Sequence, residues 1–388
     1  MTTTPEKRFA FGRNWQSFID KKLSEERLQQ AQQHLVQFCG QESLTGKSFL
    51  DIGSGSGLHS YAAFLAGAAK IVSFDYDHQS VLATQALWRM AGSPANWTVQ
   101  QGSVLDAAFM ASLGHFDLVY SWGVLHHTGD METAINLASQ CVQPGGCFYF
   151  GLYDSDWSAE SPEFWFEVKQ KYLDHSPLRK RLDEIWYLWR FELAKTPANL
   201  PVLFRKWVNY KENRGMDMMH DVRDWLGGWP MQYSRFADVV QQLSGLGFQY
   251  NKSKMGEIVT EYLFAKPSHP ALVKPLILNV IDLRTKHDFA RLDKNQPIYI
   301  FGAGQGGQII QTYLKDCGYN ICGFISNSAG SQHSAVMSLE TMLSQHPQGQ
   351  IIIASAAIDE ISMQLINQGI TTWFNSYPMI RAHFAGYV

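Results

Sequence analysis

The stretch "KSFLDIGSGSGLHS" (47–60) joins a short apolar run to a loop that has a glycine at every second position. Asp51 closes the apolar run, and Gly53, Gly55 and Gly57 follow it. Because glycine has no Cβ, such a loop can turn sharply into a helix and pass close to a ligand. The stretch therefore predicts a strand, a ligand-binding loop and a helix, in that order.

The residues after this loop alternate between apolar runs and helical patterns. The strand candidates of this region are 48–53, 70–75, 97–102, 116–121 and 147–153. This alternation predicts a doubly wound, parallel α/β sheet of the Rossmann type. Two further strand candidates, 248–254 and 258–267, lie close enough in sequence to form an antiparallel hairpin.

The same patterns divide the chain of 388 residues, which is too long for one compact core. We expect an N-terminal helical segment, a first α/β domain with a helical, Trp-rich insertion, a linker and a second, smaller Rossmann-like α/β domain. Their predicted bounds are 1–45 for the N-terminal segment, 46–267 for the first domain, 155–235 for its insertion, 268–296 for the linker and 297–388 for the second domain.

The second domain begins with another glycine loop, in "PIYIFGAGQGG" (297–307). Gly302, Gly304 and Gly307 have the G-x-G-x-x-G spacing of dinucleotide-binding folds. The next predicted strand should end in an acid that holds a ribose, yet it ends in Ser326 and Asn327. A neutral side chain binds a hydroxyl more weakly than a carboxylate does. We therefore interpret this loop first as a signature of about half a dinucleotide-binding fold and only second as a ligand site.

Composition and charge indicate which classes of protein this sequence fits. Charged residues make up 17% of the chain, its net charge is −3, and no Lys/Arg tract stands out. We therefore expect a globular protein without a nucleic-acid or membrane partner. The polar N-terminus gives no sign of a signal peptide, and none of the five cysteines forms a C-x-x-C pair. A cytoplasmic protein with reduced thiols and no metal site is the simplest interpretation.

Acidic residues also end the next predicted strands of the first domain. Asp75 follows Gly53 by 22 residues, a spacing suited to a carboxylate that accepts hydrogen bonds from a ribose diol. Asp106 ends the third strand, where an adenine amine could be bound. An NAD-binding domain is the alternative, but Asp51, two residues before the first glycine, would repel a pyrophosphate and suits an amino group instead.

These blocks carry a family resemblance. "FLDIGSGSG", "SFDYD", "GSVLD", "YSWGVLHHTGDM" and "PGG" resemble the motifs of class I S-adenosylmethionine-dependent methyltransferases. "RFAFGRNW" (8–15) and "RGMDMMHDVRDWLGGWP" (214–230) resemble a bacterial branch related to the ubiquinone-biosynthesis methyltransferases. The resemblance covers about residues 8–267 and says little about the methyl acceptor.

The resemblance implies S-adenosyl-L-methionine as cofactor and a set of residues that bind it. The loop would hold the amino-acid end, the acid of the second strand the ribose, the third strand the adenine, and the end of the fourth strand would lie beside the methyl group. A segment with Phe11, Asn14 and Trp15 would close over the cofactor, unless it only packs there. The implied cofactor-binding residues are Trp15, Asp51, Gly53, Ser54, Gly55, Gly57, Asp75, Tyr76, Ser103, Val104, Leu105, Ser121 and Trp122.

Catalytic candidates follow from the need for a base when the acceptor is a hydroxyl or a protonated amine. His126 and His127 follow the fourth strand, although either could be a core histidine, and Asp130 suits a helix N-cap. His220 and Asp224 are spaced i, i+4 and could form a base with its orienting carboxylate, or hold a lid shut.

Aromatic residues of the insertion could line an acceptor pocket or form the core of a helical cap. The insertion holds the tryptophans Trp157, Trp165, Trp186, Trp189, Trp207, Trp225 and Trp229. We single out Trp225, together with Tyr153 and Asp154 at the end of the fifth strand, as substrate candidates.

The leading hypothesis is a methyltransferase that acts on an oxygen or nitrogen of a small molecule, such as a metabolite, a sugar or a natural-product intermediate. RNA methylation is the alternative within the same class of enzyme. A non-catalytic protein that binds the cofactor, or that assembles as a homo-oligomer through its C-terminal domain, is the alternative from another class.

Overall fold

A seven-stranded sheet organises the first part of the chain. The computed structural model describes residues 11–155, 160–193, 195–210, 217–256, 259–269, 275–327 and 336–384. The sheet has the order β3-β2-β1-β4-β5-β7-β6, and β7 runs antiparallel to both of its neighbours. This antiparallel strand distinguishes it from the parallel order 3-2-1-4-5-6 of a dinucleotide-binding sheet. Its strands are β1 (Ser48–Ile52), β2 (Lys70–Asp75), β3 (Trp97–Gln101), β4 (Phe116–Trp122), β5 (Val142–Tyr153), β6 (Gln249–Met255) and β7 (Val259–Ala265).

Helices cover both faces of this sheet because successive strand residues point to opposite sides. Phe49, Leu118 and Tyr149 pack toward α2 and α3 on one face, and Leu50, Val119 and Phe148 pack toward α5, α6 and α11 on the other. The helices are α1 (Phe11–Lys22), α2 (Glu25–Phe38), α3 (Leu58–Leu65), α4 (His78–Met90), α5 (Ala107–Leu113), α6 (Met131–Gln140) and α11 (Phe236–Gly245). The strands and the hairpin expected from the sequence are confirmed.

Local capping explains where several helices begin. Ser24 caps α2 by accepting a hydrogen bond from the Arg27 amide, and Asp130 caps α6 by accepting one from the Thr133 amide. The role of Asp130 agrees with the expectation from the sequence, and both caps act because short polar side chains satisfy the free amides of a first helical turn.

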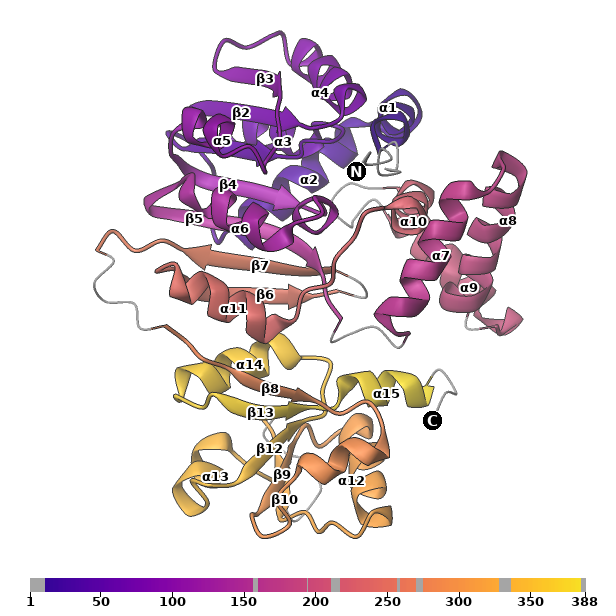
Figure 1. Cartoon of the computed structure of the whole chain (residues 1–388), viewed down its shortest axis with the longest axis vertical. Helices are drawn as coiled ribbons and strands as arrows, with labels where there is room; N and C mark the ends of the chain where they lie inside the picture. The colour runs from indigo at the N-terminus through magenta and orange to yellow at the C-terminus, as the bar shows by residue number, and fades with distance from the viewer. Residues whose placement is uncertain are drawn as a thin grey trace, which may run out of the picture.

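A helical insertion between β5 and α11 projects beyond the carboxyl edge of the sheet (Figure 1). Its helices are α7 (Pro162–Asp174), α8 (Pro177–Tyr187), α9 (Leu200–Asn209) and α10 (Met218–Gly227), with the π-helical turn η2 (Leu188–Glu192) and the 3-10 turn η3 (Pro197–Asn199). Trp165, Tyr172, Tyr187 and Trp225 form a small core of their own. Trp157 and residues 214–216 lie outside the described residues.

The second domain contains a six-stranded parallel sheet in the order β11-β10-β9-β12-β13-β8. Five of its strands follow the 3-2-1-4-5 order of a dinucleotide-binding fold, and β8 takes the sixth place although it precedes the others in the chain. The elements are β8 (Asn279–Asp282), β9 (Ile298–Phe301), β10 (Gly323–Ile325), β11 (Val336–Met337), β12 (Gln350–Ile353), β13 (Thr372–Asn375), α12 (Gln305–Asp316), α13 (Leu339–Gln345), α14 (Ile358–Asn367) and α15 (Tyr377–Phe384).

The expectation of a linker over 268–296 is wrong for part of that segment. Residues 279–282 form β8, which pairs with β13, and Lys286–Arg291 form the 3-10 helix η6. A strand of four residues is too short to give a recognisable alternation in the sequence. The second sheet is therefore larger than the half-fold that the sequence predicted.

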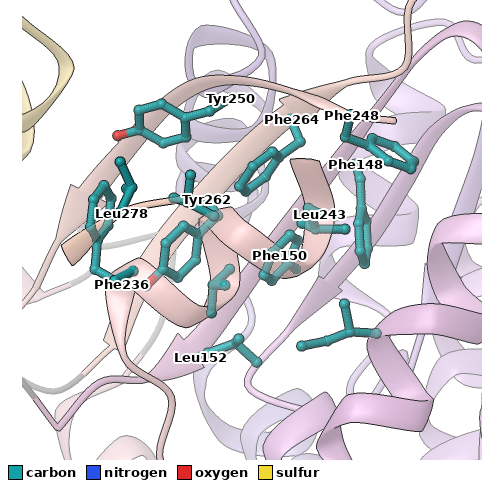
Figure 2. Close-up of a cluster of buried hydrophobic side chains, with 14 of the residues drawn as sticks. Phe148, Phe150, Leu152, Phe236, Leu243, Phe248, Tyr250, Tyr262, Phe264 and Leu278 are labelled. Atoms are coloured by element: carbon teal, nitrogen blue, oxygen red, sulfur yellow. The ribbon is translucent and has the colours of Figure 1, made fainter. Parts of the chain in front are cut away.

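The two sheets share one hydrophobic core. Figure 2 shows Leu278, at the entrance to β8, beside Tyr250 and Phe236 of the first domain. Helix α14 packs against β6, and the Arg235 guanidinium donates a hydrogen bond to the Val280 carbonyl at 3.1 Å. The second domain thus lies along the β6 edge of the first sheet (Figure 1). No helix among the described residues is long and apolar enough to cross a membrane.

Candidate functional site

A cavity of about 1040 Å³ opens at the carboxyl ends of β1, β2 and β4. The glycine loop after β1, the ends of the neighbouring strands, helix α1 and the helical insertion all contribute to its wall. Open α/β sheets bind ligands at this edge, because the loops that leave neighbouring strands converge there.

The glycine loop after β1 forms the part of the cavity wall where the backbone packs most closely against neighbouring side chains. Gly53, Gly55 and Gly57 have φ angles of 72°, 55° and 80°, in the left-handed region that favours glycine. A Cβ on Gly55 would lie 2.9 Å from Nε1 of Trp15, and one on Gly53 would overlap Val124. Ser54 also lines the cavity. The loop therefore needs glycine both for its turn and for its close approach to α1.

Asp51 is buried at the end of β1, and it lines the cavity. Its Oδ2 accepts a 2.5 Å hydrogen bond from Ser60, whose hydroxyl lies 2.6 Å from that of Ser73. Burial raises the pKa of the Asp51 carboxyl to about 7, although the Ser60 hydrogen bond opposes this shift. Near neutral pH this carboxyl is poised between its protonated and ionised forms.

Asp75 ends β2 and faces the same loop. Its two oxygens accept hydrogen bonds from the backbone amides of Gly55 and Asp77, both at 2.9 Å. Burial raises the pKa of Asp75 to about 6, against the effect of these hydrogen bonds. Tyr76 lies next to it in the cavity wall and is mostly exposed.

The loop after β3 contributes Ser103, Val104 and Leu105 to the cavity, as the resemblance implies. The Ser103 hydroxyl accepts a hydrogen bond from the Leu105 amide at 3.2 Å. Asp106 does not line the cavity; its Oδ1 caps α5 by accepting hydrogen bonds from Ala108 and Phe109. Ser103 therefore lines the cavity, whereas Asp106, the residue considered for an adenine amine, does not.

The end of β4 places two neighbouring residues differently. Trp122 lines the cavity, with its ring against Gly151 of β5. Ser121 is fully buried outside the cavity wall, and its hydroxyl donates to the Ile52 carbonyl at 3.1 Å. The expectation that Ser121 lies beside the cofactor is wrong, because alternate strand residues face opposite sides of the sheet.

The two histidines after β4 also differ. His126 is fully buried outside the cavity wall, and neither ring nitrogen has a hydrogen-bond partner. Its ring lies 3.9 Å from that of Tyr153, centroid to centroid, and burial keeps its pKa well below 6.5. His126 is a core histidine, so its expected catalytic role does not fit this position.

His127 lines the cavity. Its Nδ1 lies 2.6 Å from the Pro230 carbonyl oxygen, which can only accept, so Nδ1 carries the proton and Nε2 the lone pair. Burial, together with the charge of Lys169, lowers the pKa of His127 to about 3. At neutral pH His127 is therefore an uncharged hydrogen-bond acceptor.

His220 and Asp224 share α10 but do not form the expected pair. His220 is buried outside the cavity wall, its Nδ1 lies 2.8 Å from Asp217, and its Nε2 has no partner. Asp217 is the N-cap of α10, which explains its position one turn before the histidine. Asp224 lines the cavity and accepts a 2.8 Å hydrogen bond from Asn14 of α1. The helix that carries Trp15 is thereby tied to α10 across the cavity.

The substrate candidates form part of an aromatic wall. Tyr153 and Trp225 line the cavity with ring centroids 4.8 Å apart, and Trp229 and Tyr187 extend the wall. The Trp225 Nε1 is buried without a hydrogen-bond partner. Asp154 is turned away: it is buried outside the cavity wall and accepts a hydrogen bond from Thr260 at 2.9 Å. Its proposed place beside the substrate is therefore wrong.

Several charged residues near the cavity were missed by the sequence analysis. Lys169 is fully buried behind the aromatic wall; it donates a hydrogen bond to the Trp225 carbonyl, and its ammonium lies 4.0 Å from the Trp225 ring. Burial keeps its pKa well below 10.5. The sequence does contain a signal for this buried lysine. Lys169 lies one turn after Trp165 and three residues before Tyr172, within the apolar face of α7. Glu192 and Lys206 line the cavity as an ion pair at 2.7 Å.

The second glycine loop packs against other residues of its own domain. A Cβ on Gly302 would lie 2.7 Å from the Ala354 carbonyl oxygen, so this glycine is needed for packing between β9 and β12. After β10, the Asn327 amide donates a hydrogen bond to Gln364 of α14. These contacts fit the interpretation of the loop as a fold signature. No group of three or more potential metal ligands occurs among the described residues.

Comparisons with known proteins relate part of this chain to methyltransferases. A family model described as a methyltransferase domain matches residues 24–198. A tRNA U34 carboxymethyltransferase from Methylococcus capsulatus is 32% identical over 103 residues, which are 26% of this chain and 31% of the relative. A ubiquinone biosynthesis O-methyltransferase from a Methylobacterium species is 30% identical over 110 residues, which are 28% of this chain and 42% of the relative.

The chain thus spans less than half of the length of these curated relatives. Among solved structures, magnesium protoporphyrin IX methyltransferase from Synechocystis, with bound SAH, is similar over 66% of this chain and 93% of its own. The identity is 13% and the TM-score 0.40.

Proposed function

We propose that this chain, which carries a class I S-adenosylmethionine-dependent methyltransferase domain related to the ubiquinone-biosynthesis methyltransferases, methylates an oxygen or nitrogen atom of a small molecule. The observation that carries the proposal is one cavity lined both by the glycine loop and by the aromatic side chains of the helical insertion. Its volume of about 1040 Å³ is just above the range of roughly 300–1000 Å³ that is typical of ligand pockets. A cofactor and an acceptor can therefore occupy it together.

The chemistry of the loop fits the cofactor. When bound, S-adenosylmethionine supplies a methyl group activated by its sulfonium. We propose that Asp51 and the glycine loop bind the amino-acid end, that Asp75 binds the ribose hydroxyls, and that Ser103 binds the adenine amine. A carboxylate has about four acceptor positions, so Asp75 keeps free positions after accepting the two backbone amides.

The remaining groups would orient the acceptor. Holding a nucleophile in line with the reacting carbon supplies much of the acceleration of such a transfer. We propose that the aromatic rings of Tyr153 and Trp225 hold the acceptor and that the neutral His127 accepts a hydrogen bond from its hydroxyl or amine. We further propose that Asp224, which also lines the cavity, takes the proton released by the acceptor.

RNA methylation is the second candidate. It is supported by the name of the Methylococcus relative, and by seven Lys and Arg against three Asp and Glu in residues 177–208. Incubation with S-adenosylmethionine carrying a tritiated methyl group, alongside either total tRNA or a small-molecule extract, separates the two. We expect label in the small-molecule fraction; label only in nuclease-sensitive material would contradict the proposal.

Two further attributes are proposed with this function. All five cysteines are free thiols, which supports a reducing compartment such as the cytoplasm. A homo-oligomer formed through the C-terminal domain stays a prediction, which light scattering of the full chain measures.

A further inference from the structure

The outer faces of α8 and α9 expose many apolar side chains. Of the sixteen large hydrophobic residues that are exposed in the described part of the chain, nine lie between residues 178 and 208. Their exposed fractions run from 43% to 71%. These nine residues, called the apolar face below, are Leu178, Leu182, Ile185, Trp189, Leu200, Val202, Phe204, Trp207 and Val208. A concentration of this kind marks an interaction surface rather than scattered surface residues.

The spacing of the apolar face is that of amphipathic helices. On α8 and the turn after it, Leu178, Leu182, Ile185 and Trp189 recur every three or four residues and form one exposed stripe, while Glu184 and Tyr187 point inward. Helix α9 has no buried residue, yet Phe204, Trp207 and Val208 lie together on its exposed side. An apolar helix side that is more than half exposed among the described residues is available to an external partner.

Basic residues accompany the apolar face. Residues 177–208 have a net charge of +4 in a chain whose net charge is −3. Arg181 lies within the exposed stripe of α8 and Arg205 lies beside Phe204, and both are exposed. Neither forms an ion pair within the described ranges. Trp, Phe and Leu with flanking Lys and Arg are the composition of helices that lie in a membrane interface.

We propose that α8 and α9 dock this protein on the surface of a bilayer that contains anionic lipid. The apolar face would enter the boundary between head groups and acyl chains, and Arg181 and Arg205 would meet lipid phosphates. A second copy of this chain fits less well, since a two-fold contact would bring two segments of net charge +4 together. No membrane partner was expected from the sequence, because the exposure of these side chains is visible only in the fold.

The docking surface adjoins the cavity. Lys206 and Tyr210, from the inner side of α9 and the residue after it, line the cavity, as do Tyr187 and Glu192 from α8 and η2. Figure 1 shows α8 and α9 at the outer side of the insertion, beyond α7 and α10. Docking would therefore bring the acceptor side of the cavity to the bilayer, and it does not depend on which acceptor is methylated.

Co-sedimentation of the full chain with vesicles tests the proposal. We expect binding to vesicles of mixed phosphatidylglycerol and phosphatidylcholine, weaker binding in high salt, and little binding to phosphatidylcholine alone. Trp207→Ser combined with Phe204→Ser should lower the partition coefficient by about tenfold or more. Each of Arg181→Glu and Arg205→Glu should lower it by at least about fivefold. Ile277→Ser, an equally exposed apolar residue, and Lys315→Glu are the matched controls and should change nothing.

Circular dichroism melts of the variants establish that each is folded. Absence of vesicle binding by the wild-type chain would overturn the proposal. Two other results, each obtained with a chain that does not bind vesicles, would also overturn it. One is a concentration-dependent oligomer that Trp207→Ser dissociates, and the other is a tRNA complex that Arg181→Glu abolishes. Binding that Ile277→Ser weakens as much as Trp207→Ser would also contradict it.

Discussion

At the scale of single residues, Asp51 and Asp75 decide how the cavity responds to pH. Their pKa values of about 7 and about 6 are raised chiefly by burial, so each is partly protonated in mildly acidic solution. Binding a positively charged amino group favours the ionised form of Asp51. If Asp51 binds the amino group as proposed, cofactor binding should release a proton from it.

We expect the affinity for S-adenosylhomocysteine to rise by about tenfold between pH 6 and pH 8, since Asp51, with a pKa of about 7, ionises in this interval. The affinity rises with pH because the protonated form of Asp51, which binds an ammonium poorly, is lost as the pH increases. Calorimetric titrations at several pH values measure the effect. Asp51→Asn should bind weakly with little pH dependence; an unchanged pH dependence in this variant would assign the effect to another group.

His127 carries a second pH prediction. Its pKa of about 3 means that the ring stays neutral through the working range, so it should add no step near pH 6.5 to the rate at saturating cofactor. The pH profile of the wild type, compared with that of His127→Gln, measures this. A step near pH 6.5 that disappears in the variant would contradict the assigned environment.

Three pairs of adjacent residues show which features of the site could be predicted from the sequence and which could not. In Ser121 and Trp122, in His126 and His127, and in Tyr153 and Asp154, one residue lines the cavity and its neighbour is buried elsewhere. The order of strands and loops places all six near the carboxyl edge of the sheet. Which member faces the cavity depends on the register of each strand and on the path of each loop, and a single sequence does not specify these.

At the scale of elements, α1 links the cofactor loop to the helical insertion. Its Gly12 amide donates a hydrogen bond to Asp77 at 2.8 Å, and Trp15 lies against Gly55. On the other side the Asn14 amide group donates to Asp224 and to the His220 carbonyl, at 2.8 and 3.1 Å. Docking of α1 therefore depends on groups far apart in the sequence.

Asn14→Ala should weaken binding of S-adenosylhomocysteine by up to about tenfold and lower the unfolding free energy by about 1–2 kcal/mol, because it removes a hydrogen bond to a charged group. Titration calorimetry and denaturant unfolding measure the two effects. Gln16→Ala on the same helix, which removes only an exposed hydrogen bond to Asp20, is the control. Equal effects of the two substitutions would show that the tie to α10 contributes nothing.

Elements with strong local signals were predictable. The helix that follows Ser24 and the strand that ends at Asp75 are set by capping and apolar patterning within the segment itself. Strand β8 and the arrangement of α7 to α10 depend on distant partners: β8 on pairing with β13, and the insertion on a core shared by Tyr153 and Trp225. Such pairings leave no trace in a window of a few residues.

At the scale of the whole molecule, the shared core joins the two sheets. Tyr250 of β6 is buried where α14 packs against that strand, and its hydroxyl lies 2.8 Å from that of Ser253. An interface of this kind makes independent unfolding of the two domains unfavourable.

Tyr250→Ala should therefore lower the unfolding free energy by about 3 kcal/mol through the loss of buried aromatic surface. Differential scanning calorimetry should give one transition, shifted downward as a whole. Leu246→Ala, at an exposed position next to α11, is the control and should cost less than about 0.5 kcal/mol. Two separate transitions in the wild type would contradict the shared core.

The upstream glycine loop, with its acids, is the proposed binding site of S-adenosylmethionine. Titration calorimetry with S-adenosylhomocysteine tests it most directly, in the wild type, in Asp75→Ala, and in Asp106→Ala as a control that removes a helix cap outside the cavity. We predict one site per chain, a loss of about 1–3 kcal/mol in Asp75→Ala and unchanged affinity in Asp106→Ala. No heat with the wild type, or equal affinity in all three proteins, would contradict cofactor binding at this loop.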